Sequence, residues 1–394
     1  MLLSGPFIAL TGNAPSEIWL VFISVIFLAR SAINREWQWA RQIWFRASLV
    51  FWSWLILVSA TSPWPASAME HSLIWIRFPI FAAALISWLG KSERLWKHML
   101  LSLISSVLLL TVILLAERVS NPDAIRLWGT WAQNPKPGWY MLGFGLPVVL
   151  WALGELKNKP STFYWALPLV VLLVGTTLST GEVYITLSMI FGCVLFVLLS
   201  RFWSWRLLLL GSACVLITAG VLATNSQLLY RFTEEVMLRL PWLPTSDYYD
   251  PWIGGLNAGF LHPVMGLGAG NYEFYCEKLK VAGQLEILGI KHCFPHPHNL
   301  YIQVFAETGI IGLGLFILLI ISLTGPVLHR WNVMHLNVPR VTGLTILIVT
   351  TWPISTYSQA FGQHKNLFTW FLIGWALATV HLFIEGHKRK TSGQ

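Results

Sequence analysis

The feature that most constrains this chain is a series of long, continuous apolar runs that recurs along its 394 residues. Hydrophobic residues make up 55% of the sequence and charged residues only 11%, which is too apolar for a soluble protein of this length. Only helices and closed barrels satisfy every backbone hydrogen bond across a hydrocarbon core of about 30 Å. Because the apolar runs do not alternate with polar residues, the sequence predicts an all-α polytopic membrane protein.

Eleven of these runs are long enough, or nearly long enough, to cross the membrane as helices. The segment from Met1 to Gly12 is also apolar, but Gly5 and Pro6 interrupt it. It is either a broken first helix, which would make twelve, or an interfacial tail. The eleven predicted spans are residues 17–30, 44–61, 73–89, 98–116, 138–153, 163–179, 183–200, 207–223, 301–323, 342–357 and 366–384.

The basic residues are distributed unevenly between the two sets of loops that these spans define. Short cytoplasmic loops collect Lys and Arg, so the more basic set is predicted to be cytoplasmic. The net charge of +9 therefore reflects membrane topology, and nothing in the sequence suggests the soluble basic patch of a nucleic-acid-binding protein. Sixteen of the 26 basic residues lie on this side, with four of the 17 acidic ones: Arg30, Arg35, Arg41, Arg46, Lys91, Arg94, Lys97, Lys157, Lys159, Arg201, Arg206, Arg330, Arg340, Lys388, Arg389 and Lys390, with Glu36, Glu93, Glu155 and Glu385.

One long polar segment interrupts the pattern of helices, from about Thr224 to Asn299, and it falls on the side opposite the basic loops. Its Trp and Tyr residues favour an ordered structure. A shorter segment on the same side, residues 117–139, holds Arg126 and Lys136. The sequence thus predicts an N-terminal transmembrane bundle of residues 1–223, an external loop subdomain of residues 224–300, and C-terminal transmembrane helices with a short basic tail in residues 301–394.

Two of the four cysteines, Cys276 and Cys293, lie in the long external loop. An oxidising compartment would permit a disulfide between them, closing about 17 residues and worth roughly 3 kcal/mol on the loop-entropy model. A zinc site is the alternative, because His292, His296 and His298 stand close by in the sequence. The spacing of these residues fits no ordinary zinc signature.

A histidine pair stands where the external loop meets the ninth predicted span, between Cys293 and Asn299. Pro295 and Pro297 disfavour helix before them, so the histidines are predicted to lie on an extended, stiff stretch. Asn299 suits the N-cap of the following helix. The free N–H groups and positive dipole end of that helix would favour an anion such as phosphate, and a neutral His298 that can accept a proton.

Glu307 lies two turns along the same predicted helix. A carboxylate in a transmembrane segment is costly and is usually functional or paired with a cation, so Glu307 is a candidate substrate-binding residue. Gly309, Gly312 and Gly314 follow it and are predicted to let helices approach closely.

These residues resemble a known family. The segments His298-Asn299 and Gly309-Ile-Ile-Gly312, nine residues apart, are similar to the His-Asn-x9-Gly-x-x-Gly pattern of bacterial O-antigen ligases. The preceding segment from His262 to Gly270, His-Pro-Val-Met-Gly-Leu-Gly-Ala-Gly, resembles its counterpart in the wider ligase and polymerase superfamily. The resemblance is strongest from about residue 247 to residue 316, and its motifs do not separate ligase from polymerase.

The resemblance implies a glycosyltransferase with a GT-C-like fold, embedded in the inner membrane of a bacterium with its active site and loop subdomain facing the periplasm. The donor would be a glycan on undecaprenyl diphosphate. The acceptor would be a sugar hydroxyl, on lipid A-core for a ligase or on another lipid-linked glycan for a polymerase, and no metal or other cofactor is expected. His298 would take the acceptor proton, and displacement of the diphosphate would invert the anomeric configuration.

The resemblance also suggests which other side chains bind the substrates. Arg77, near the external end of the third span, and Arg231, at the start of the long loop, would hold the diphosphate. A structural ion pair explains Arg77 equally well. His296, Asn299 and Glu307 stand near the base in the sequence, and His364 lies in a short external turn that also holds Gln363 and Lys365; these are further substrate-binding candidates.

The chain departs from the family at the turn Thr180-Gly-Glu-Val183, where many members have an arginine at the last position. Another basic residue must then contact the phosphate, or the donor is held differently. Arg126 is interpreted as a surface residue.

Two other classes of function remain open. A transporter of lipid-linked glycans would also be polytopic, but internal repeats and broken midplane helices are expected of it and neither is clear in the sequence. An oligosaccharyltransferase of the same superfamily that acts on proteins would differ in its acceptor and often has additional C-terminal sequence.

Overall fold

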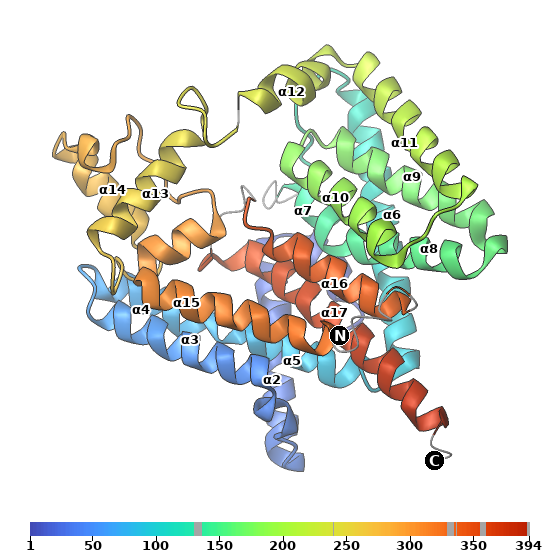
Figure 1. The fold of residues 1–394 in the computed structure, drawn as a ribbon, viewed down its shortest axis with the longest axis horizontal. Helices are drawn as coiled ribbons and strands as arrows, with labels where there is room; N and C mark the ends of the chain where they lie inside the picture. Colours follow the sequence, from blue (N-terminus) through green and yellow to red (C-terminus); the bar gives the residue numbers. More distant parts are fainter. Residues whose placement is uncertain (130–135, 239, 329–334, 336, 355–359, 392–394) are drawn as a thin grey trace.

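The computed structural model is helical throughout the part of the chain that it describes, where it contains no strand (Figure 1). It describes all residues except 130–135, 239, 329–334, 336, 355–359 and 392–394, and only the backbone of residues 363–364 and 384–391. The elements are α1 (Gly5–Leu10), α2 (Asn13–Asn34), η1 (Gln38–Arg41), α3 (Ile43–Ala60), α4 (Pro65–Trp75), α5 (Arg77–Leu89), α6 (Glu93–Ser120), α7 (Pro137–Tyr140), η2 (Met141–Gly145), α8 (Leu146–Asn158), η3 (Pro160–Thr162), α9 (Phe163–Ser179), α10 (Val183–Ser200), α11 (Trp205–Ala223), α12 (Ser226–Met237), α13 (Tyr249–Leu261), α14 (Tyr272–Val281), η4 (Leu285–Leu288), α15 (Leu300–Leu328), α16 (Val338–Thr351) and α17 (Gln363–Thr391).

Ten helical segments among the described residues are long and apolar enough to cross a membrane, so the chain is a multi-pass membrane protein. They coincide with ten of the eleven predicted spans. The other predicted span, residues 342–357, is only partly helical, because the 14-residue α16 ends at Thr351 and residues 355–359 lie outside the described part. The N-terminal segment forms α1, whose six residues are too few to span a membrane alone.

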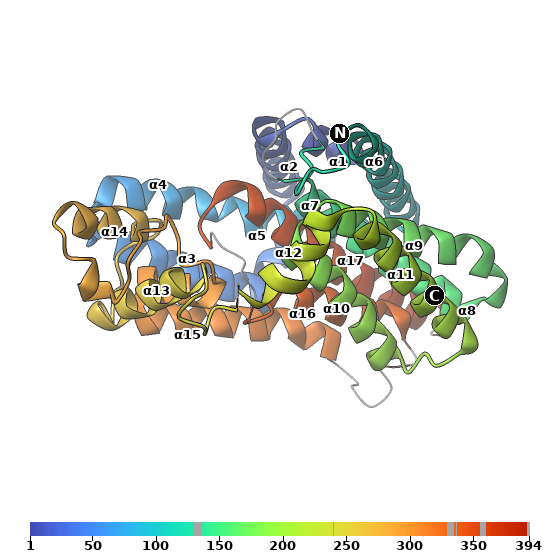
Figure 2. The same ribbon diagram turned by 90° about the horizontal axis from the view of Figure 1, so that it is seen from above.

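The centre of the bundle consists of α5 and α17, which pack along each other and against α2 and α16. Aromatic side chains fill this centre: Phe81 of α5 and Phe371 and Trp375 of α17 are fully buried, and Trp375 stacks on Trp96 of α6 at 5.0 Å. A second group of helices, α8 to α11, lies on one side of it, and a third group, α3, α4 and α15, lies on the other (Figures 1 and 2).

The segment between α11 and α15 is ordered, but its helices pack in two different places. α12 lies against α10 and α11, whereas α13, α14 and η4 lie against α15 or against one another (Figure 1). This second part has a small core of its own, to which α15 contributes one residue. The core residues are Ala258, Leu267, Tyr272, Cys276, Leu279, Leu288, Ile290 and Ala306.

Helix α15 is broken at Gly309, whose φ of +68° and ψ of −173° are not helical. The short arm before the break runs back toward the centre of the molecule, and the longer arm after it, residues 310–328, lies beside α3 (Figure 1). At 1.5 Å per residue, the longer arm alone measures about 28 Å, close to the thickness of a hydrocarbon core. The short arm therefore carries its N-terminal residues away from the membrane-spanning part of the helix.

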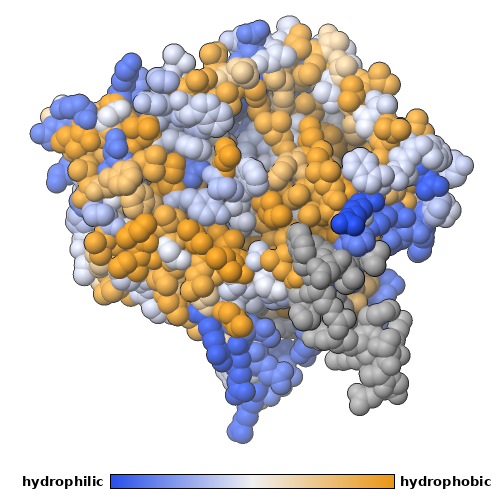
Figure 3. All heavy atoms as spheres, viewed as in Figure 1, coloured by the Kyte–Doolittle hydropathy of each residue, from blue (hydrophilic) through white to orange (hydrophobic). Residues whose placement is uncertain are grey.

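Loops that were predicted to be cytoplasmic come together at one end of the bundle. Arg30 of α2, Lys91 after α5 and Arg340 in the first turn of α16 line one cavity there. Hydrophilic atoms gather at the lower end of the view in Figure 3, below the apolar face. We call this the basic end, and the end where α7, α10, α15 and α17 begin the His298 end.

Candidate active site

His298 immediately precedes the helix α15, and the sequence around it explains why the helix starts there. The side-chain oxygen of Asn299 accepts hydrogen bonds from the backbone N–H groups of Tyr301 (3.0 Å) and Ile302 (3.1 Å), as expected of an N-cap. The prediction of an extended stretch is wrong at His298 itself, where φ is +52°. A left-handed residue between Pro297 and the cap turns the chain sharply into the helix.

Aromatic rings surround the half-buried imidazole of His298. The Tyr248 ring meets it edge-on at 5.3 Å between centroids, and the His296 ring lies 4.5 Å away. The indole of Trp252 donates a hydrogen bond to the backbone oxygen of His298 at 3.3 Å, so α13 fixes the backbone at this point. These neighbours remove water from the imidazole on several sides.

Burial keeps both histidines neutral. The pKa of His298 falls to about 4, because of burial first and then the nearby positive charge of Lys365. The pKa of His296 falls to about 3, because of burial first, then His298 and Lys365. His298 is therefore unprotonated, and able to accept a proton, throughout the neutral pH range.

Lys365 connects the histidines to a cluster of charges drawn from three other segments. Its charge interacts with Lys136 and Glu182, and its ammonium group lies 5.4 Å from the centre of the Trp139 ring. Glu182 in turn forms ion pairs with Arg126 at 3.4 Å and Lys136 at 3.8 Å. Three cations thus gather around one carboxylate beside the histidine pair.

Four residues of this region stand at or near the start of a helix. Lys136 precedes α7, Glu182 precedes α10, Lys365 lies in the first turn of α17, and His298 precedes the cap of α15. The N-terminal turn of a helix has unpaired N–H groups and the positive end of the dipole. Four such ends together with three cations make a strongly electropositive region, which suits an anion such as phosphate.

Arg231 lies near this region but is used to hold the backbone. It is 4% exposed, its Nε donates to the carbonyl oxygen of Gly181 at 2.7 Å, and its Nη1 pairs with Glu235 at 3.0 Å. The backbone next to Arg126 contacts the same turn, because Leu127 N–H donates a hydrogen bond to the carbonyl oxygen of Thr180. The Arg126 side chain is 33% exposed, so Arg126 lies at the surface while it pairs with Glu182.

Arg77 is placed apart from this cluster by its described contacts. Its guanidinium lies 2.7 Å from a carboxylate oxygen of Glu17 on α2 and covers the Phe78 ring at 5.0 Å. These contacts fit the structural ion pair that the sequence left open for Arg77. None of the described contacts of Arg77 reaches the residues around His298.

Glu307 is almost fully buried, at 1% exposure, and both of its carboxylate oxygens have partners. One accepts the backbone N–H of Gly270 at 2.6 Å, and the other accepts the amide of Gln303 at 3.2 Å. Gln303 also accepts the backbone N–H of Ala360 at 2.8 Å. Glu307 thus holds the glycine-rich segment 262–270 against the short arm of α15, which gives it a positioning role in this geometry.

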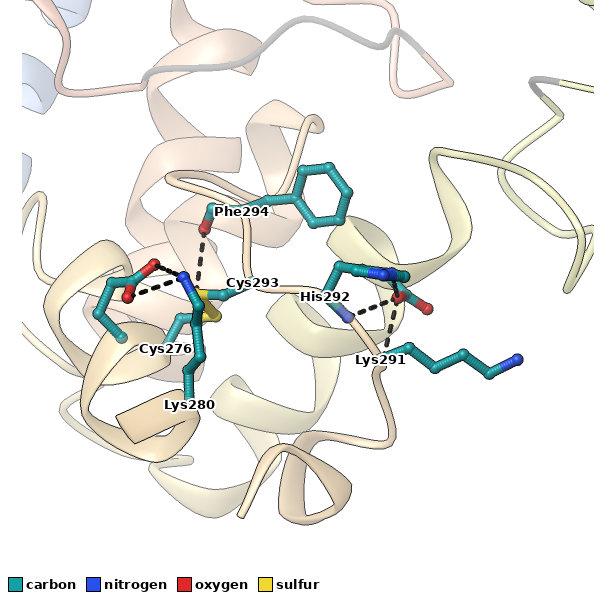
Figure 4. Close-up of a disulfide and its surroundings, with 8 residues drawn as sticks. Cys276, Lys280, Lys291, His292, Cys293 and Phe294 are labelled. Atoms are coloured by element: carbon teal, nitrogen blue, oxygen red, sulfur yellow. Dashed lines mark hydrogen bonds and ion pairs between the residues drawn. A yellow bond between two sulfur atoms is a disulfide. The ribbon is translucent and has the colours of Figure 1, made fainter. Parts of the chain in front are cut away.

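Cys276 and Cys293, in the segment between α11 and α15, are joined by a disulfide, with 5.7 Å between their α-carbons (Figure 4). Nearby, the carboxylate of Asp250 accepts the backbone N–H groups of Lys291 and His292, each at 3.0 Å. Both contacts anchor the segment that leads to the histidines. Among the described residues, no group of three or more His, Cys, Asp or Glu side chains is arranged to hold a metal ion.

The sequence did not identify two neighbours of His298, Tyr248 and Trp252, or the carboxylate of Glu182 that pairs with the nearby cations. The aromatic pair stands at the start of the region of strongest resemblance, which was the available signal. Glu182 stands in the turn that departs from the family, directly before the position of the absent arginine, Val183. The side chain of His364 lies outside the described residues, although its backbone is in the first turn of α17.

The region that contains most of this geometry also matches a protein family. The family model described as O-antigen ligase matches residues 168–317, which include Glu182, Arg231, the disulfide, His298 and Glu307. None of the curated proteins that were compared matches the chain. Over residues 168–317, the resemblance of this membrane protein to the O-antigen ligase and polymerase superfamily is therefore confirmed.

Proposed function

We propose that the protein is an O-antigen ligase-type glycosyltransferase, which moves a glycan from undecaprenyl diphosphate to a sugar hydroxyl of lipid A-core at the periplasmic face of the inner membrane. The family match supports ligase- or polymerase-type function in general. The observation that carries the proposal further is the position of a neutral, half-buried imidazole beside a cluster of three cations, in a region where four helices start. A base and an anion site next to each other are what this reaction requires.

In the proposed reaction, His298 accepts the proton of the acceptor hydroxyl while its oxygen attacks the anomeric carbon of the donor sugar. The bond from that carbon to the phosphate oxygen breaks, and its electron pair leaves with undecaprenyl diphosphate. Attack opposite the leaving group inverts the anomeric configuration. No metal is needed in this scheme, because cationic side chains and helix ends stabilise the charge on the diphosphate.

Lys365, Lys136 and Arg126 are the cations that we assign to the diphosphate. They take the place of the arginine that many family members have at the position of Val183. Arg231 supports them by fixing the carbonyl of Gly181. A direct contact of Arg77 with the donor remains a prediction from the resemblance.

His298→Ala tests the role of the base. We expect glycan transfer by the purified protein in detergent and EDTA to fall by about 10²- to 10⁴-fold, since removing a general base typically costs that much. His292→Ala is the matched control, because its side chain is 79% exposed and pairs only with Asp250 in its described contacts. Full transfer by the His298 variant would show that the base is another group.

The acceptor is tested in the same assay with and without lipid A-core. Product on lipid A-core supports the ligase. Longer lipid-linked chains formed without core would identify a polymerase instead. No product from either acceptor would contradict a glycosyltransferase acting on these glycans and return attention to a transporter or a protein acceptor.

A further inference from the structure

A cavity of about 670 Å³ lies at the basic end and not at the His298 end. Its wall is formed by the C-terminal end of α2, by η1 and the start of α3, and by the ends of α5, α15, α16 and α17 that lie nearby. The spanning arm of α15 begins after Gly309 and reaches the cavity at Pro326. None of the residues around His298 lines this cavity.

The polar part of the wall carries an excess of positive charge. Arg30, Lys91 and Arg340 contribute three cations, against the single carboxylate of Glu36. Arg340 is 6% exposed, so its side chain lies inside the bundle. Arg30 and Lys91 are exposed at the rim of the cavity. His381, also in the wall, lies with a ring nitrogen 3.2 Å from the backbone oxygen of Gly90. The wall therefore attracts an anion.

Aromatic side chains form part of the remaining wall, and they pack closely. The Phe27 ring lies 5.0 Å from that of Trp39 and 5.7 Å from that of Trp88. The indole of Trp39 donates to the hydroxyl of Ser31 at 3.1 Å, which fixes η1 against α2. Tryptophan is typical of the boundary between headgroups and acyl chains, where its apolar body and polar N–H are both satisfied. The cavity thus combines cations with rings that suit a lipid.

We propose that this cavity binds the phosphodiester headgroup of an anionic membrane phospholipid, with the start of its acyl chains against Phe27, Trp39 and Trp88. Basic pockets between transmembrane helices on the cytoplasmic side are suited to such headgroups. The exposed guanidinium group of Arg30 can donate two hydrogen bonds to phosphate oxygens. This site is independent of the proposed transfer reaction and stands if that reaction is a different one.

The test measures binding of phosphatidylglycerol to the purified full-length protein by native mass spectrometry. The double variant Arg30→Gln/Lys91→Gln is expected to weaken binding about tenfold or more, because each basic residue near a headgroup adds substantially to the attraction. The matched control is Arg46→Gln/Arg94→Gln, which removes two exposed charges from the same end but none from the cavity wall. Both double variants should retain glycan transfer.

Three results would overturn the proposal. Equal loss in both double variants would mean that diffuse surface charge, and not the cavity, attracts the lipid. If phosphatidylcholine bound as well as phosphatidylglycerol, the cavity would bind acyl chains without distinguishing between the headgroups. Displacement of phosphatidylglycerol by millimolar inorganic phosphate would identify a site for a free anion. Loss confined to the cavity variant, with phosphate and phosphatidylcholine both ineffective, supports the lipid site.

Discussion

Burial is the main cause of the low pKa of His298, and the charge of Lys365 on a different helix adds to it with a measurable consequence. The pKa of His298 is lowered to about 4, so the base is available at all pH values above that point. Lys365→Gln removes a nearby positive charge that disfavours the imidazolium, so the pKa should rise. The acid limb of kcat/KM is therefore expected to move to higher pH, measured as a pH profile of transfer.

The control for this shift is Lys291→Gln, which removes an exposed charge from the segment that leads to the histidines. Its pH profile should match that of the unaltered protein. If Lys365→Gln lowers transfer equally at every pH, Lys365 acts only on the substrate or on the fold, and its influence on His298 is refuted.

The residues of the site differ in how far the sequence could identify them. His298 and Asn299 belong to one short motif, so their position before a helix was predictable. Lys365 was predicted to share a turn with the candidate His364, but its interaction with Glu182, far away in the chain, depends on tertiary packing that no local pattern encodes. Tyr248 precedes the short helix α13, and only the fold brings its ring against His298.

The break in α15 depends on two glycines that face each other. A Cβ on Gly309, at φ +68°, would lie 2.1 Å from the carbonyl oxygen of Val264, and one on Gly266, at φ +68°, would lie 2.3 Å from the backbone carbon of Glu307. Backbone hydrogen bonds join the same segments, from Gly268 N–H to Glu307 O at 2.8 Å and from Ile310 N–H to Pro263 O at 2.8 Å. The glycine-rich segment thus fills the break in the helix.

Gly309→Ala should therefore destabilise the protein by more than the roughly 1–2 kcal/mol that a left-handed alanine costs, because the new methyl group also meets backbone. Gly314→Ala on the same helix is the control, since nothing lies within 4 Å of its added Cβ. Thermal unfolding in detergent compares the two variants. Equal stability would show that the break is not held by Gly309.

The disulfide gives a second prediction at the level of elements. Replacing Cys276 and Cys293 together by serine removes a cross-link across a separation of 17 residues, worth about 3 kcal/mol on the loop-entropy model. Limited proteolysis should then cut between α14 and the histidine segment faster than in the unaltered protein. Reductant should accelerate cleavage of the unaltered protein but not of the double variant. Equal cleavage rates before reduction would contradict the prediction.

The transmembrane helices could be predicted from the sequence, because a continuous apolar run is identified by its length and composition alone. The points at which helices are interrupted could not be predicted in this way. The predicted span 73–89 begins in α4 and changes helix at Ile76, and the predicted close-packing glycine Gly309 proved to be a break. Both interruptions depend on the groups that tertiary packing brings against the helix, such as the carbonyl oxygen of Val264 at Gly309, and not on the local residues.

The membrane orientation is a property of the whole molecule and can be tested by labelling. In a background without Cys193 and Cys214, Val281→Cys places a thiol on α14, where the native side chain is 86% exposed. Ile33→Cys places one at the basic end, where the native side chain is 81% exposed. We expect an impermeant maleimide to label position 281 in intact spheroplasts and position 33 only after permeabilisation. The reverse pattern would invert the topology.

The ion pairs of Glu182 have a consequence for how the proposed donor would respond to salt. Glu182 neutralises part of the charge of Arg126 and Lys136 from within the chain. A diphosphate that binds these cations would exchange with a tethered carboxylate, and fewer mobile counterions would be released to solution. The affinity for the donor would then depend less steeply on ionic strength than the number of cations alone suggests.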